Sequence, residues 1–439
     1  MGFFGRFFNN KPATNQLNIP FGRYSDAYKT DLQYQLWDNA VQAYDEENYL
    51  KALEFFLHYL KDEKGSNVKE WMDDGVLKFE IIQGSKKIIG SADSQHIEVE
   101  AKVAHTEGLK VAFMRQLMER NYALKYSRFA LDENDDISMR FDTDLIDASP
   151  YKLFNALKEV AINSDKLDDL LIDEYDVLSP INNQHIGEST EAERETKYQF
   201  VHQWISKTLE ITKSLNKREL AAGVAYLLLD LTYKMDYLIK PEGFLMETLE
   251  RIHRRYFERD GLSVDGKCQM LVKEFEKVLA RSKEDLQKEM YHTIATFGIT
   301  APVNHDKVVS FIDGELSNMD WYIRNHYPNI ALAIPGYIAG YCMFEFAVPK
   351  PDRELLHLYF EIVEAPYFTS LGYKKQFYNS NNGKFDKAAI RQRIHQIVKS
   401  NQEKYPYLQS NTSILDFKNL QSFAYSYMMM IRALDLSVD

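Results

Sequence analysis

Cysteine is scarce in this sequence. Only Cys268 and Cys342 occur among its 439 residues, far apart and in no CxxC arrangement. Two cysteines so placed provide neither a disulfide framework nor a cysteine zinc site, and they are typical of a reducing compartment. We therefore expect a cytoplasmic protein without a disulfide framework.

The sequence also lacks the short motifs that identify common enzyme classes. It contains no GxxxxGK[ST], GxGxxG, GxSxG or HExxH pattern. These patterns supply phosphate-binding loops, dinucleotide-binding turns, hydrolase nucleophiles and zinc-protease ligands. No catalytic residue is assigned from the sequence, and we expect a protein that is not an enzyme and binds no cofactor.

An acidic segment matches part of a calcium-binding loop. Asp132, Asn134 and Asp136 occupy positions one, three and five of an EF-hand. Such a loop also needs a glycine at position six and a glutamate at position twelve, where this chain has Ile137 and Thr143. We interpret the segment as a solvated hairpin turn and predict no metal site.

Basic residues are outnumbered by acidic ones. The chain has 53 Lys and Arg against 65 Asp and Glu, a net charge of −12 that disfavours nucleic acid as a partner.

One basic cluster has the spacing that places side chains on one side of a helix. It consists of Arg251, Arg254, Arg255 and Arg259. The cluster is either a site for an anion or an acidic partner, or a face paired internally. We favour internal pairing, because Glu247 and Glu250 precede two of the arginines by four residues.

One segment, residues 330–348, approaches the length of a membrane span. It carries no charge before Glu345, and Gly336 and Gly340 have the spacing at which helices approach closely. A span needs about 20 apolar residues, and Pro335 interrupts this run. We favour a buried central helix, with a membrane helix as the alternative.

The first residues are apolar but too few for a secretory signal, since polar residues follow from Asn9 onward. A phenylalanine-rich tip that carries Arg6 would suit a membrane interface. Its phenylalanines are Phe3, Phe4, Phe7 and Phe8. We expect a flexible segment over residues 1–30, with membrane contact as the less favoured alternative.

The next part of the chain predicts an α+β domain over residues 31–178. Helical spacing of apolar residues predicts two helices between residues 31 and 60. Period-two alternation and turn signals then predict strands, with one short helix from residue 109 to 120. The strands are expected near residues 77–82, 86–90, 96–103, 122–131 and 137–141. Ser149 before Pro150 begins a Leu-rich helix.

This element order resembles that of a known group of proteins. The segments that carry the resemblance are Asn121-Tyr122, Arg128-Phe129-Ala130-Leu131-Asp132, Ile137-Ser138-Met139-Arg140-Phe141 and Ser149 before the Leu-rich helix. Over residues 45–175 the chain resembles the YbjN and type III secretion chaperone-like group. The resemblance implies a five-stranded antiparallel sheet flanked by helices and binding of other polypeptides rather than catalysis. It assigns no contact residue.

After a polar link, residues 191–439 predict an all-α domain. The pattern is helical almost throughout, and prolines and glycines supply the breaks. The helices are expected near residues 191–215, 217–239, 242–258, 267–281, 284–297, 304–326, 330–347, 352–363, 385–400 and 413–434.

Together these observations favour a non-enzymatic protein-binding module, chaperone- or adaptor-like, whose partner is another polypeptide. One alternative is a structural subunit of a membrane-associated assembly, anchored by the N-terminal phenylalanines or by residues 330–348. The other is an enzyme with an unrecognised site in the helical domain. Convergence of His253, His292 or His357 with carboxylates in a pocket would indicate that site.

Overall fold

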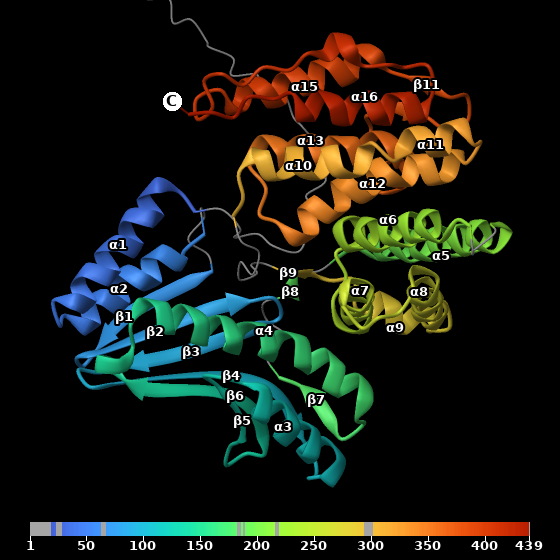
Figure 1. Cartoon of the computed structure of the whole chain (residues 1–439). Coiled ribbons are helices and arrows are strands. Elements are labelled where there is room, and N and C mark those ends of the chain that lie inside the picture. Colours follow the sequence, from blue (N-terminus) through green and yellow to red (C-terminus); the bar gives the residue numbers. More distant parts are fainter. Residues whose placement is uncertain are drawn as a thin grey trace, which may run out of the picture.

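A computed structural model describes residues 19–22, 29–62, 67–181, 186–187, 189–215, 219–293 and 302–438. An antiparallel sheet flanked by helices is followed by a predominantly helical region (Figure 1). This arrangement confirms the predicted α+β class with an N-terminal sheet and a C-terminal helical part.

The main sheet has seven described strands, two more than predicted. They are β1 (Val68–Asp73), β2 (Val76–Gln83), β3 (Lys86–Ala92), β4 (His96–Thr106), β5 (Arg128–Leu131), β6 (Asp136–Asp144) and β7 (Leu178–Pro180). Their order is β1-β2-β3-β4-β6-β5, and β7 pairs with β4 beyond the end of β3. The edge strand β1 was missed because most of its side chains, including Trp71 and Met72, are exposed and do not alternate. The predicted strand 122–131 begins only at Arg128, since α3 extends to Ala123 and residues 124–127 form an irregular connection.

Helices cover one face of this sheet. α1 (Asp31–Asp45) and α2 (Tyr49–Leu60) pack together, and α4 (Pro150–Glu174) packs against β3, β4 and β6. Every second residue of β2 is buried, as in an antiparallel strand with one covered face. α3 (Val111–Ala123) packs beside β5 over a small separate core.

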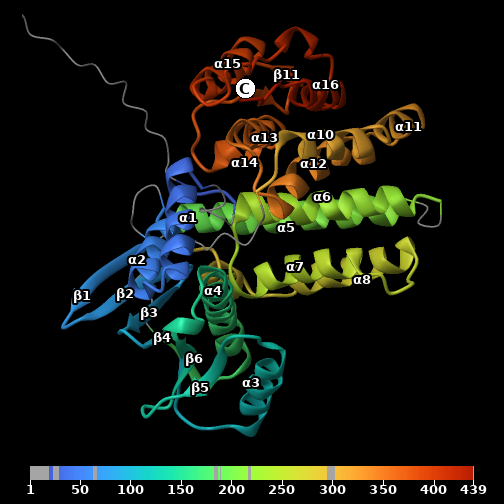
Figure 2. The same ribbon diagram turned by 60° about the vertical axis from the view of Figure 1, so that its left-hand side comes forward.

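The C-terminal region is a stack of helices. Its elements are α5 (Glu191–Ser214), α6 (Ala221–Ile239), α7 (Gly243–Phe257), α8 (Val264–Leu279), α9 (Lys283–Lys288), α10 (His305–Leu316), α11 (Met319–Arg324), α12 (Pro328–Glu345), α13 (Lys350–Val363), α14 (Ala365–Ser370), α15 (Lys387–Asn401) and α16 (Leu420–Arg432). In Figure 2, α7 and α8 form the lowest layer, α5 and α6 lie above them, and α15 and α16 lie at the opposite end. Two pairs of two-residue strands occur here: β8 (Ile186–Gly187) with β9 (His292–Thr293), and β10 (Tyr378–Asn379) with β11 (Lys384–Phe385).

Several predicted helix bounds differ from the structure. The segment 304–326 is two helices, because the chain turns after Leu316 before α11 begins. The last helix begins at Leu420 rather than at 413, since residues 412–414 form a short 3-10 turn. The short helix α14 was missed.

The apolar segment predicted as a buried helix is α12, which packs along α6 in the centre of the stack. A Cβ atom on Gly340 would lie 2.6 Å from Cβ of Tyr233, and one on Gly336 would lie 2.1 Å from Oδ1 of Asp230. The two glycines therefore allow the close approach of α12 to α6, as expected from their spacing. Among the described residues, no helix has the length and apolar character of a membrane span.

Part of the segment predicted to be flexible packs on the helical region instead. The Gly22 N–H donates a 2.9 Å hydrogen bond to the carbonyl oxygen of Tyr237. The Phe21 ring lies 5.1 Å from the His357 ring and 5.4 Å from the Phe368 ring, centroid to centroid. Aromatic burial thus fixes residues 19–22 against a part of the chain that is distant in sequence.

Candidate functional sites

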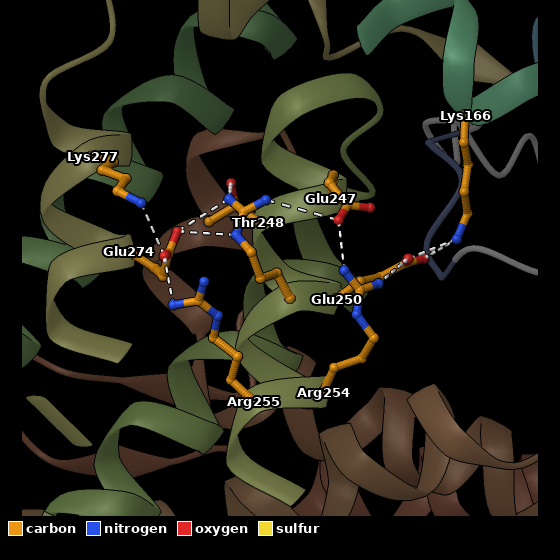
Figure 3. Close-up of polar contacts among 9 residues, drawn as sticks. Lys166, Glu247, Thr248, Glu250, Arg254, Arg255, Glu274 and Lys277 are labelled. Carbon is orange, nitrogen blue, oxygen red and sulfur yellow. Dashed lines mark hydrogen bonds and ion pairs between the residues drawn. The ribbon is translucent and has the colours of Figure 1, made fainter. Parts of the chain in front are cut away.

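The predicted arginine cluster lies at the junction of α7, α8 and α4. Within α7, Arg254 Nη2 lies 2.7 Å from Glu247 Oε1, and Arg251 and Arg254 form the four-residue pairs that the sequence predicts, at 3.8 and 3.7 Å. Across to α8, Glu274 pairs with Arg251 at 3.1 Å. It also pairs with Arg255 at 3.5 Å (Figure 3).

The same network joins the two parts of the chain. Lys166 of α4 donates to both carboxylate oxygens of Glu250, at 2.6 and 2.8 Å (Figure 3). Both side chains are largely buried, with 26% and 11% of their surface exposed. Arg259 lies beyond the end of α7 and is exposed. Three of the four arginines are therefore paired: Arg254 pairs within α7, and Arg251 and Arg255 pair across to α8.

The three histidines named from the sequence each contact a different carboxylate. His253 lies 3.7 Å from Glu345. His292 lies 2.7 Å from Glu193. His357 lies 3.5 Å from Glu361. None of the three is among the residues that line the cavity described below.

The acidic segment is the turn between β5 and β6. Asp132 Oδ1 accepts hydrogen bonds of 2.9 Å from the N–H groups of Asn134 and Asp136. A hydrogen bond from Lys102 is the main cause that lowers the pKa of Asp132 to about 2. Among the described residues, no group of three or more His, Cys, Asp or Glu side chains is arranged to hold a metal ion. The hairpin interpretation is confirmed.

The candidate membrane-contact residues Phe3, Phe4, Phe7 and Phe8 lie outside the described part of the chain. That prediction stays open.

An exposed apolar surface lies on α3. Val111 is 84% exposed, Met118 is 69% exposed and Tyr122 is 96% exposed. The opposite side of the helix carries Phe113 and Leu117, which are buried against the sheet. The helix is thus apolar on both sides, and among the described residues its outer side remains uncovered. We call the apolar surface formed by Val111, Met118 and Tyr122, together with Leu109 just before the helix and the half-buried Met114, the α3 stripe; it lines a shallow depression of about 540 Å³.

A second feature is a cavity of about 300 Å³ in the helical stack, lined by residues of α5, α6, α12 and α13 and by the segments that follow α13. Aromatic side chains form much of its wall. They are Phe200, Trp204, Tyr359, Phe360 and Tyr378.

Three charged side chains meet on the wall of this cavity. Lys234 Nζ donates a 2.9 Å hydrogen bond to Glu364 and lies 3.7 Å from Asp230. Glu364 also accepts a 3.1 Å hydrogen bond from the Trp204 indole N–H. Burial raises the pKa of Asp230 to about 6; Lys234 opposes this rise and Glu364 adds to it.

Sequence reasoning missed this cavity because its residues come from distant segments. A signal was nevertheless present, since Asp230 and Lys234 stand four residues apart in a stretch that is apolar on all sides. Charged residues are almost never fully buried unless they are paired, so their position in such a stretch points to an internal polar contact.

Comparison with known proteins assigns the chain to no family. The chain matches no family model, and a search of curated proteins finds no significant match.

Proposed function

We propose that this protein is a non-enzymatic polypeptide-binding module and that its partner binds along the α3 stripe as an amphipathic helix. The observation that carries the proposal is the exposure of Val111, Met118 and Tyr122 on a helix whose other side is already buried. Contiguous exposed apolar surface of this kind marks interaction sites in proteins. The resemblance of residues 45–175 to polypeptide-binding chaperones supports the same function.

The shape of the stripe favours a helical partner. Val111, Met118 and Tyr122 follow one another at intervals of seven and four residues, which keeps them on one side of α3. At 1.5 Å per residue they extend over about 16 Å, or three helical turns. Helices that bind to apolar surfaces do so through apolar residues repeated over a few turns.

Charge selects among helical partners. Lys110 and Arg115 line the stripe together with one acidic residue, Glu119, which pairs with Arg115 at 2.9 Å. The stripe is therefore locally basic in a chain whose net charge is −12. Charge complementarity therefore favours an acidic amphipathic helix of another protein as the partner.

Site-specific photo-crosslinking tests this proposal in the native cell. The crosslinking amino acid p-benzoylphenylalanine replaces Tyr122 in the full chain. In a control chain it replaces Tyr407, which is exposed and lies between α15 and α16. We expect a protein adduct at position 122 that is absent at position 407. Mass spectrometry should place it in a segment with acidic residues and apolar residues at helical spacing.

The variant Met118→Glu distinguishes this specific contact from non-specific hydrophobic binding. Met118 is mostly exposed, so the variant should keep the wild-type melting temperature while the adduct at position 122 decreases at least tenfold. An adduct that Met118→Glu leaves unchanged, or one formed only with a second copy, would overturn the proposal. A lipid adduct in place of a protein would favour the membrane-associated alternative.

A further inference from the structure

Aromatic side chains from two helices line the cavity in the helical stack. Phe200 and Trp204 come from α5, and Tyr359 and Phe360 come from α13. A volume of about 300 Å³ is at the small end of the range typical of ligand pockets. Aromatic faces attract cations, and Lys234 Nζ already lies 5.2 Å from the centre of the Trp204 ring.

The charges on the wall are not fully balanced. Lys234 is positive, and burial, which lowers its pKa, is outweighed by Glu364 and Asp230, which raise it. Against this one cation stand two carboxylates, Asp230 and Glu364. The inner wall therefore carries a net charge of about −1 near neutral pH. Lys207 also lines the cavity, but its side chain is exposed to solvent, where water screens its charge.

The two carboxylates differ in the hydrogen bonds that they accept. Glu364 accepts hydrogen bonds from Lys234 and from the Trp204 indole. Asp230 has a looser contact, with Lys234 Nζ 3.7 Å away, and its Oδ1 rests against the bare Cα of Gly336. A hydrogen-bond donor that approached Asp230 would stabilise its largely buried charge more than it would stabilise an exposed carboxylate.

We infer that this cavity binds a small organic amine in its ammonium form, with the ammonium group on Asp230 and the apolar part against the aromatic side chains. The inference depends on the cavity alone and not on the α3 stripe. It adds a small-molecule site in the helical region to the protein contact proposed for the sheet domain.

The test uses two probes of nearly equal size, 2-phenylethylammonium and the neutral 2-phenylethanol. Calorimetric titration of the full-length protein at pH 7.5 should show at least tenfold tighter binding of the ammonium. Lowering the pH to 5 protonates Asp230 in the free protein and should weaken ammonium binding about tenfold. Binding of the alcohol should change much less, because it carries no charge. Lys207, Lys234, Tyr359 and Glu364 also face this cavity, so a variant must assign the pH effect to Asp230.

The variant Asp230→Asn should remove the preference for the ammonium over the alcohol. Its control is Glu210→Gln, which neutralises an exposed carboxylate on α5 and should bind both probes as the wild type does. Equal affinity of the wild type for both probes would overturn the inference, and this comparison needs no variant to fold. Ammonium binding that survives Asp230→Asn unchanged would also overturn it.

Discussion

His305 and Asp352 form a buried charged pair between α10 and α13, with Nδ1 2.9 Å from Oδ1 and side-chain exposures of only 8% and 0%. Burial opposes the charge on His305, but the hydrogen bond and the charge of Asp352 outweigh it, so the pKa of His305 is raised above 6.5. Burial also raises the pKa of Asp352. Both groups bind protons more tightly in the folded protein than in the unfolded chain. The stability that His305 contributes is fully present below its unfolded pKa of about 6.5 and is lost as the pH rises through the higher folded pKa.

We therefore predict that His305→Gln destabilises the protein by about 3 kcal/mol at pH 6, because it leaves Asp352 buried without its partner. The loss should be smaller at pH 8.5. Urea unfolding at both pH values measures the difference, and the exposed His395→Gln on α15 serves as control. A loss that is equal at the two pH values would contradict this assignment.

At the scale of elements, the contact between α6 and α12 depends on glycine. A Cβ on Gly340 would lie 3.2 Å from the backbone carbonyl carbon of Tyr233 as well as close to its side chain, so the two helices would have to separate. We predict that Gly340→Ala lowers the free energy of unfolding by about 2 kcal/mol. The matched control is Gly314→Ala in α10, where an added Cβ would meet no atom within 4 Å. There alanine should stabilise the protein by about 0.5–1 kcal/mol. Chemical unfolding of both variants tests the difference in sign.

The elements also show where prediction from sequence succeeds and where it ends. The helix α12 could be predicted because its uncharged run and its Gly336–Gly340 spacing are local signals. The strand β1 could not, because an edge strand with exposed Trp71 and Met72 is specified by its pairing with β2 rather than by its own pattern. The cavity depends on Glu364 meeting Lys234 across 130 residues, and no local pattern encodes such a contact.

At the scale of the whole molecule, α4 lies beside α7 in both views, and the Lys166–Glu250 pair joins them (Figures 1 and 2). Because this pair is largely buried, we predict a coupling energy of about 1–2 kcal/mol in a double-mutant cycle of Lys166→Ala and Glu250→Ala. The exposed Lys51–Glu54 pair of α2 should give about 0.3 kcal/mol in the same experiment. Equal coupling energies for the two pairs would show that Lys166–Glu250 does not hold the two parts together.

The position of Phe21 has a consequence for synthesis of the chain. Phe21 leaves the ribosome long before its aromatic neighbours Phe368 and Tyr373 are synthesised. At typical rates of 5–20 residues per second, these neighbours follow roughly 20 to 70 seconds later. The sheet domain lies between Phe21 and these neighbours in the sequence. It therefore has time to fold before residues 19–22 can pack against the helical region. When the helical stack is complete, Phe21 packs against it. The segment from residue 21 to residue 373, which includes the whole sheet domain, therefore begins and ends at the same place in the fold.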